Sequence, residues 1–318
     1  MSLDRIPNSD SAARDRRVAH AVLVRPNRRR LLVSVVLSLC LLIPTNIQAL
    51  NIDLSFTGSS LTSSGFIPPD TMGAVGPNEF VELLNGQYSV YRKSDGVRLQ
   101  TNTLNGFWQN AGVVPAGSFA FDPRAVYDPS TQRWFAASVD NSFAPNNILI
   151  AVSKSANPTD GWTGFAIPSD SDKSHWADFP TLGVNSKGVF VAANMFPLTG
   201  GGQNTSVLVV PKADLLAGTV ANRTLFENIP NTGFSLQPAV GDASVSGSTV
   251  SILLSAFNTA GGQFKRSDIV GSVTLPLLDP TDKFIAVPAF SGPPNALQPG
   301  TKLPLEVLDS RISSNVVI

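Results

Sequence analysis

The stretch WADFPTLGVNSKGVFVAANMF (176–196) carries the pattern that decides the fold. Asp178 opens a short apolar run, NSKG (185–188) follows as a turn, and a longer apolar run comes next. Short apolar runs bounded by Gly, Asn and Ser are typical of β-strands joined by tight turns. The stretch therefore predicts an antiparallel hairpin whose first strand begins beside a carboxylate.

The same phrase of polar residue, short strand, turn and longer strand occurs four times along the chain. Its polar first residues are Asp70, Asp122, Asp178 and Gln237, spaced by 52, 56 and 59 residues. A fifth unit opens at Asp309. Repeats of this length, with about four strands each, indicate propeller blades. We predict an all-β fold, a β-propeller of four-stranded blades with four complete blades and the start of a fifth.

A ring that stops inside its fifth blade is incomplete, so we expect this chain to be truncated relative to a full propeller. The alternative is that four blades close by themselves and residues 309–318 form a tail. Helical patterns are rare, and two short helices are predicted, at LNGFWQN (104–110) and PKADLLAG (211–218).

Residues 1–49 are predicted to be a secretory signal peptide, and residues 50–318 the propeller domain. Arginines precede an apolar run from Leu31 to Ile43, and the small residue Ala49 offers a cleavage site. The run is shorter than the roughly 20 residues that cross a bilayer. We therefore expect no stable membrane span after cleavage, and a bacterial protein that is secreted, periplasmic or on the cell surface.

The charge of the chain changes when the leader is set aside. Residues 50–318 contain 15 Lys and Arg against 20 Asp and Glu, a net charge of −5. Such a chain is a poor partner for nucleic acid. The single cysteine, Cys40, lies in the leader, so disulfide and thiol chemistry are excluded from the predicted domain.

Four phrases of the chain are more specific: PPDTMGAVGPNEFVELLNGQYSVYRKSDG (68–96), FDPRAVYDPSTQRWF (121–135), DFPTLGV (178–184) and QPGT…LDSR (298–311). They resemble the blades of secreted bacterial β-propeller proteins of largely uncharacterised function, whose architecture is related to sialidase-type and kelch-type propellers. The resemblance spans about residues 65–318. It implies the architecture and no particular activity, and it implies a chain that continues past the LDSR phrase.

The first strand of each blade lines the channel of a propeller, so Asp70, Asp122, Asp178 and Asp309 are predicted to converge at its mouth. Convergent carboxylates serve as glycosidase acids and nucleophiles, as calcium ligands, or as caps that accept backbone N–H groups. A residue repeated in every blade is best explained by a need of every blade, which favours caps. No cofactor is predicted, with calcium at these aspartates as the one alternative.

Two arginines occupy matching places, Arg124 in DPR and Arg311 in DSR. They suit either an inter-blade ion pair or a clamp for a ligand carboxylate. His175 and Trp176 have no counterpart in the other repeats, and both are candidates for ligand contact. With one histidine and no cysteine after residue 50, a zinc site is not expected.

These features predict an exported, non-catalytic β-propeller whose mouth binds a ligand or partner, such as a glycan or a surface protein. The alternative is a carbohydrate-active enzyme, glycosidase-like or sialidase-like, with Asp70, Asp122, Asp178 and Arg124 lining the site. Against the enzyme, no glutamate falls at the start of a blade, where a general acid is expected. No confident catalytic residue follows from the sequence alone.

Overall fold

The computed structural model describes residues 52–229, 232–242, 246–279, 281–300, 302–305, 307, 309–313 and 316–318. The predicted leader (1–49) lies outside the described residues. Contacts group Asp53–Ile318 into one compact unit. Within the described residues, no helix has the length and apolar character that crossing a membrane requires.

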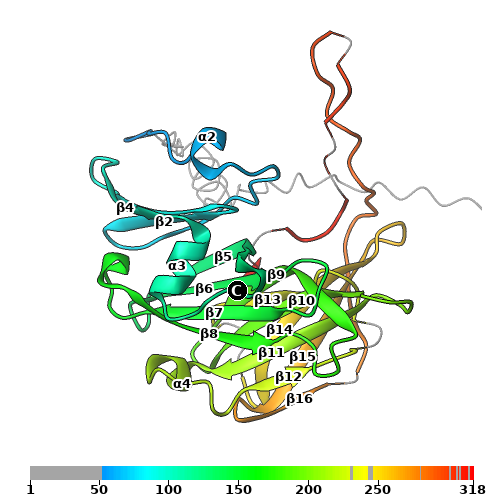
Figure 1. Ribbon diagram of the computed structural model, residues 1–318. Helices are drawn as coiled ribbons and strands as arrows, with labels where there is room; N and C mark the ends of the chain where they lie inside the picture. Colours follow the sequence, from blue (N-terminus) through cyan, green and yellow to red (C-terminus); the bar gives the residue numbers. More distant parts are fainter. Residues whose placement is uncertain are drawn as a thin grey trace, which may run out of the picture. The chain divides into compact units, whose positions relative to one another are not determined.

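The chain folds as four antiparallel sheets in sequence order, the blades of a β-propeller (Figure 1). Blade 1 contains β1 (Met72–Val75), β2 (Glu79–Leu84), β3 (Gln87–Arg92) and β4 (Arg98–Asn102). Blade 2 contains β5 (Ala120–Asp128), β6 (Arg133–Asp140), β7 (Asn147–Ser153) and β8 (Trp162–Pro168). Blade 3 contains β9 (His175–Val184), β10 (Gly188–Pro197), β11 (Asn204–Pro211) and β12 (Thr224–Phe226).

Blade 4 contains β13 (Gln237–Val240), β14 (Thr249–Asn258), β15 (Gln263–Ser272) and β16 (Leu275–Leu278). Two further strands join this sheet. β17 (Lys283–Ala286) pairs with β15, and β18 (Val316–Val317) pairs in parallel with β13. The predicted start of a fifth unit is therefore a strand alongside the innermost strand of blade 4.

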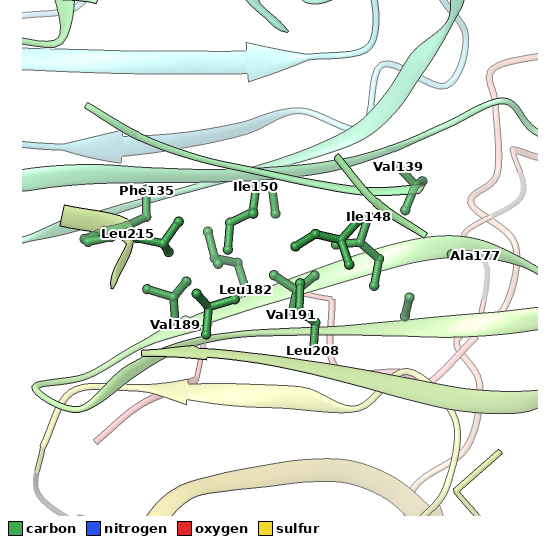
Figure 2. Close-up of a cluster of buried hydrophobic side chains, with 14 of the residues drawn as sticks. Phe135, Val139, Ile148, Ile150, Ala177, Leu182, Val189, Val191, Leu208 and Leu215 are labelled. Carbon is green, nitrogen blue, oxygen red and sulfur yellow. The ribbon is translucent and has the colours of Figure 1, made fainter. Parts of the chain in front are cut away.

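The apolar runs are continuous because the middle strands are buried on both faces. Successive side chains of a strand point to opposite faces. In β6, Phe135 and Val139 pack toward blade 3, whereas Trp134 packs toward blade 1. Figure 2 shows the cluster between blades 2 and 3, where Ile148 and Ile150 lie opposite Leu182 and Val191. Each large apolar side chain buried in this way contributes about 1.5–3 kcal/mol.

The innermost strands follow one another around the channel: β1 contacts β5, β5 contacts β9, and β9 contacts β13. Each is associated with a non-glycine residue of left-handed backbone, which lies two residues before β1 and β13 and at a bulge within β5 and β9. These residues are Asp70 (φ 42°), Asp122 (φ 52°), Phe179 (φ 49°) and Ser235 (φ 57°). The spacing of these four positions is 52, 57 and 56 residues.

This register corrects the alignment expected from sequence. Phe179, and not Asp178, is the counterpart of Asp122, and Ser235 takes the place given to Gln237. The hydrogen bonds agree: Arg124 Nε donates to Pro180 O at 2.7 Å, and Thr181 Oγ1 donates to Leu236 O at 2.5 Å, each reaching one blade onward. The repeat is therefore defined by backbone conformation. The polar residues in the sequence mark the position of the left-handed residue only to within one or two residues.

Both predicted short helices are present, as α3 (Leu104–Asn110) and α4 (Lys212–Leu216). A third, α2 (Leu61–Ser64), precedes blade 1, and two 3₁₀ turns span Ala116–Ser118 and Pro158–Asp160. Thr103 caps α3 by accepting the N–H of Gly106 at 2.9 Å. The helices therefore connect or flank blades and leave the sheets as the body of the fold.

Gly183 allows β9 to approach β13 at the channel, which gives a testable prediction. A Cβ atom on Gly183 would lie 2.6 Å from Pro238 Cβ and 2.7 Å from Ala239 O. Neither neighbour is a flexible side-chain end, so Gly183→Ala should cost about 1–3 kcal/mol of unfolding free energy. Gly292→Ala is the control, because nothing lies within 4 Å of its Cβ position. Equal denaturation midpoints for the two variants would contradict this packing.

Candidate functional site

The start of each inner strand is tied to the preceding blade by one repeated bond. The left-handed residue donates its backbone N–H to a side chain from that blade. Asp122 N donates to Asn85 Oδ1 at 2.8 Å, Phe179 N to Asp122 Oδ2 at 3.1 Å, and Ser235 N to Asn194 Oδ1 at 2.7 Å. The capping role predicted for the repeated aspartates is therefore confirmed for Asp122.

Three aspartates from three blades meet where these strands begin. Asp70 precedes β1, Asp122 lies at a bulge in β5, and Asp178 pairs with Asn194 at a bulge in β9. The carboxyls of Asp70 and Asp178 are both within hydrogen-bonding reach of the Asp122 carboxyl. We call Asp70, Asp122 and Asp178 the aspartate cluster. The predicted convergence occurs, although Asp178 arrives from one position earlier in its blade.

The cluster holds a proton at neutral pH. Burial, followed by the charges of Asp178 and Asp70, raises the pKa of Asp122 to about 8. Burial also raises the pKa of Asp178, against the opposing effects of its hydrogen bond with Asp122 and the charge of Arg311. Carboxyls in contact titrate as a coupled group, in which one retains its proton because like charges cannot all be accommodated.

Arg124 is buried beside the cluster and binds carbonyl groups. Besides Pro180 O, its guanidinium donates to Ser313 O at 3.0 Å and lies 3.4 Å from the Met72 sulfur. Burial lowers the pKa of Arg124 to about 10, while the charges of Asp122 and Asp70 act in the other direction. Arg124 thus supplies a fixed positive charge to the cluster and links three segments of the channel wall.

Arg311 reaches the site through an aromatic ring. The guanidinium carbons of Arg124 and Arg311 lie 4.8 and 4.7 Å from the centre of the Phe179 ring. Asp309 is half-exposed and does not join the aspartate cluster. Its carboxylate lies 2.6 Å from Arg311 Nη2. The structure therefore brings Arg311 to the cluster and leaves Asp309 as the ion-pair partner of that arginine.

His175 and Trp176 occupy other surroundings. His175 Nδ1 lies 2.7 Å from Ser174 Oγ, and its Nε2 lies 3.1 Å from Gly202 O and 3.2 Å from Asn204 Nδ2. Its backbone N–H donates to Asp170 Oδ2 at 2.8 Å, so none of these contacts is with the aspartate cluster. Trp176 is only 8% exposed, because neighbouring phenylalanines cover its ring. Ligand contact by Trp176 stays a prediction.

A cavity of about 350 Å³ opens over the cluster. Its lining is Asp70, Thr71, Met72, Asp122, Pro123, Arg124, Phe179 and Ser313. A larger hollow of about 530 Å³ lies between blade 2 and α4, but no carboxylate lines it. Among the described residues, no three His, Cys, Asp or Glu side chains are arranged to hold a metal ion.

Asn85 and Phe179 are site residues that sequence reasoning missed. Besides accepting the Asp122 N–H, Asn85 donates from Nδ2 to Asp70 Oδ2 at 2.6 Å and so joins two members of the cluster. The available signal was the small polar residue that ends the second strand of a repeat. Phe179 could not be found by searching for polar residues, because its role depends on its left-handed backbone and not on a polar side chain. In blade 4, Gln237 is buried, and its Oε1 has no partner among the described atoms.

The comparisons with known proteins give distant structural matches only. No protein-family model matches the chain, and no curated protein is similar to it in sequence. Solved structures with distant similarity to it include five-bladed β-propeller glycoside hydrolases and a neuraminidase-like protein. The Bacillus subtilis arabinanase is 17% identical over 71% of this chain and 81% of its own, with a TM-score of 0.40.

Two further matches are of the same kind. The endo-arabinanase from Bacillus licheniformis is 14% identical over 73% of this chain and 83% of its own, with a TM-score of 0.39. The Cellvibrio cellulosa α-L-arabinanase complexed with arabinohexaose is 14% identical over 70% and 76% of the two chains, with a TM-score of 0.35. At these identities the likeness concerns the propeller fold alone.

The shared proton predicts how stability depends on pH. Folded Asp122 keeps a proton that the unfolded chain releases above about pH 4. Its contribution to the free energy of unfolding is therefore full below about pH 4 and is lost as the pH rises toward 8. Asp122→Asn should flatten this dependence and raise the melting temperature above that of the wild type at pH 9, measured by circular dichroism.

Asp122→Ala is the matched comparison. Asn still offers an acceptor to the Phe179 N–H, whereas Ala leaves that group unpaired, at a cost of about 1–2 kcal/mol. Asp122→Ala should therefore be less stable than the wild type at pH 5, where Asp122→Asn is not. A wild-type pH slope in Asp122→Asn would show that the proton lies elsewhere.

Proposed function

We propose that this protein is a carbohydrate-active propeller, which binds a glycan at the mouth of its channel and cleaves it with the aspartate cluster. The observation that supports this proposal is the buried carboxyl of Asp122, whose pKa is raised to about 8 and which lines an open cavity with Asp70, within hydrogen-bonding reach of Asp178. Strongly shifted carboxyls in a cleft are typical of acid–base sites.

A structural role does not account for the acidity of the cluster. At two of the three blade junctions, a neutral asparagine accepts the backbone N–H, through Asn85 or Asn194. Only between blades 2 and 3 does a carboxyl do so. Among the described residues, no member of the cluster forms an ion pair that would offset its burial. Buried carboxyls cost stability, so their retention supports a chemical role.

The chemistry follows from the division between protonated and ionised carboxyls. Glycoside hydrolysis needs a carboxylic acid that protonates the leaving oxygen and a carboxylate that assists attack at the anomeric carbon. In this proposal Asp122 is the acid, and Asp178, beside the positive charge of Arg311, is the assisting carboxylate. Burial raises the pKa of both carboxyls, and the charge of Arg311 opposes this effect at Asp178, which favours Asp178 as the ionised partner of an acid–base pair.

Export supports a glycan as the partner. The predicted leader (1–49) would deliver the domain outside the cytoplasm, where polysaccharides and surface glycoproteins are found. The cavity volume of about 350 Å³ also falls in the range of small-ligand pockets. The substrate class is therefore proposed as extracellular glycan.

A second candidate, a non-catalytic propeller that binds a glycan or a surface protein, is favoured by one observation. The Asp122 carboxyl is in hydrogen-bonding reach of both partners. Acid and nucleophile in retaining glycosidases stand about 5–5.5 Å apart, and in inverting enzymes about 6.5–9.5 Å. A bound ligand would have to part the carboxyls before cleavage, whereas binding alone makes no such demand.

A hydrolysis screen together with a glycan array tests the proposal. Release of reducing ends from polysaccharides should fall about 100-fold or more in Asp122→Asn and Asp178→Asn, because general acid–base catalysis contributes at least that much. Asp95→Asn, on an exposed hairpin of blade 1, should match the wild type. Glycan binding without turnover would support the non-catalytic candidate, and neither binding nor turnover would refute both.

A further inference from the structure

Phe143 is an exposed aromatic residue that neither the core nor the aspartate cluster uses. It lies in the connection between β6 and β7 and is 78% exposed. Its backbone is left-handed, with φ of 62°. A bulky residue rarely adopts this conformation, and such strain persists where the surroundings enforce it. The position therefore suggests a function for the ring.

The loop that carries Phe143 is held by buried polar groups. Asn146 Nδ2 donates to Asp140 O at 2.9 Å and to Ala177 O at 2.8 Å. The Asp140 carboxylate accepts the N–H of Ala116 and of Asn147, each at 2.7 Å. The ring is thus presented on a fixed frame, which lowers the entropy cost of binding a ligand.

Phe143 belongs to a row of seven aromatic rings at the mouth end of the blades, which we call the aromatic band. Its ring centre lies 4.8 Å from that of Trp176. From Trp176 the row continues in two directions, with centre-to-centre distances of 5.4–6.4 Å toward blade 1 and 5.5–5.7 Å toward blade 4. Its members are Phe66, Phe119, Phe121, Phe143, Trp176, Phe196 and Phe234.

The band has a buried centre and an accessible outer part. Phe121 and Trp176 are buried, whereas Phe66 and Phe143 are exposed and the other three rings are half-buried. Gly86 makes room for Phe66: a Cβ atom there would collide with the Phe66 ring, and the φ of Gly86 is 82°. The covered tryptophan therefore serves as the base on which the accessible rings rest.

The band is continuous with the aspartate cluster along the chain. Phe121 directly precedes Asp122, and Trp176 stands two residues before Asp178. A ligand seated on the band thus has its next segment near the carboxyls. Apolar rings beside hydrogen-bonding carboxyls match a sugar, which presents a flat C–H face and an edge of hydroxyl groups.

We propose that the aromatic band is a platform for a glycan chain of several sugar units, on which Phe143 stacks against a sugar ring and the chain leads toward the aspartate cluster. This inference rests on the proposed function and extends it from the cavity at the aspartate cluster to a surface that holds further sugar units of the same glycan. Phe143 is a specificity residue for chain length here, with no part in bond cleavage.

Affinity gel electrophoresis with soluble arabinan, xylan and hydroxyethyl cellulose tests the platform. At least one polymer should retard the wild type. Phe143→Ala should weaken that binding about tenfold or more, a typical effect of losing an aromatic stacking contact. Phe143→Trp should retain it. Leu275→Ala is the control, because Leu275 is 79% exposed at the start of β16, on blade 4 and outside the band.

The outcomes separate this inference from the proposed function. If Phe143→Ala binds as tightly as the wild type while Asp122→Asn loses turnover, the platform is wrong and the hydrolase stands. If Phe143→Ala alone loses binding and the wild type shows no turnover, the platform stands without the hydrolase. Absence of wild-type retardation by all three polymers would overturn the platform. So would concentration-dependent dimerisation in gel filtration that Phe143→Ala abolishes, since the band would then be a contact between copies.

Discussion

One backbone N–H at the start of each inner strand sets the arrangement of the site. The donor residue is left-handed, so its N–H points to a side chain of the preceding blade and not into its own sheet. Asn85, Asp122 and Asn194 accept these bonds in turn. These bonds join neighbouring blades at this end and bring the strand starts together. Polar side chains at the strand starts therefore lie close to one another.

The acidity of the site follows from that crowding. Asp122 accepts the Phe179 N–H while touching two more carboxyls, so it combines a structural bond with a shared proton. The two arginines nearby do not neutralise it directly. Arg124 donates its hydrogen bonds to carbonyl groups, and Arg311 forms an ion pair with Asp309. The charge balance therefore leaves the cluster able to take up or release a proton near neutral pH.

The architecture was predictable from sequence because its cause is periodic. Strands covered on both faces give continuous apolar runs, and the runs recur with the blades. The site was predictable only in part. Asp70, Asp122, Asp178 and Arg124 do meet, but the register slipped at Asp178, since no residue type marks left-handed backbone at Phe179. The burial of Trp176 was not predictable, because the rings that cover it come from β5, β10 and the β6–β7 loop, which no local pattern reveals.

The two-sided burial of the middle strands also bears on how this chain can be divided. Each blade is a complete meander in sequence, so its own strand pairings are local and fast to form. Yet β6 and β10 have no face that tolerates water, and a blade cut out by itself would present apolar surfaces on both sides. Such a fragment would therefore be prone to aggregation. In this molecule each blade keeps water away from the apolar faces of its neighbours.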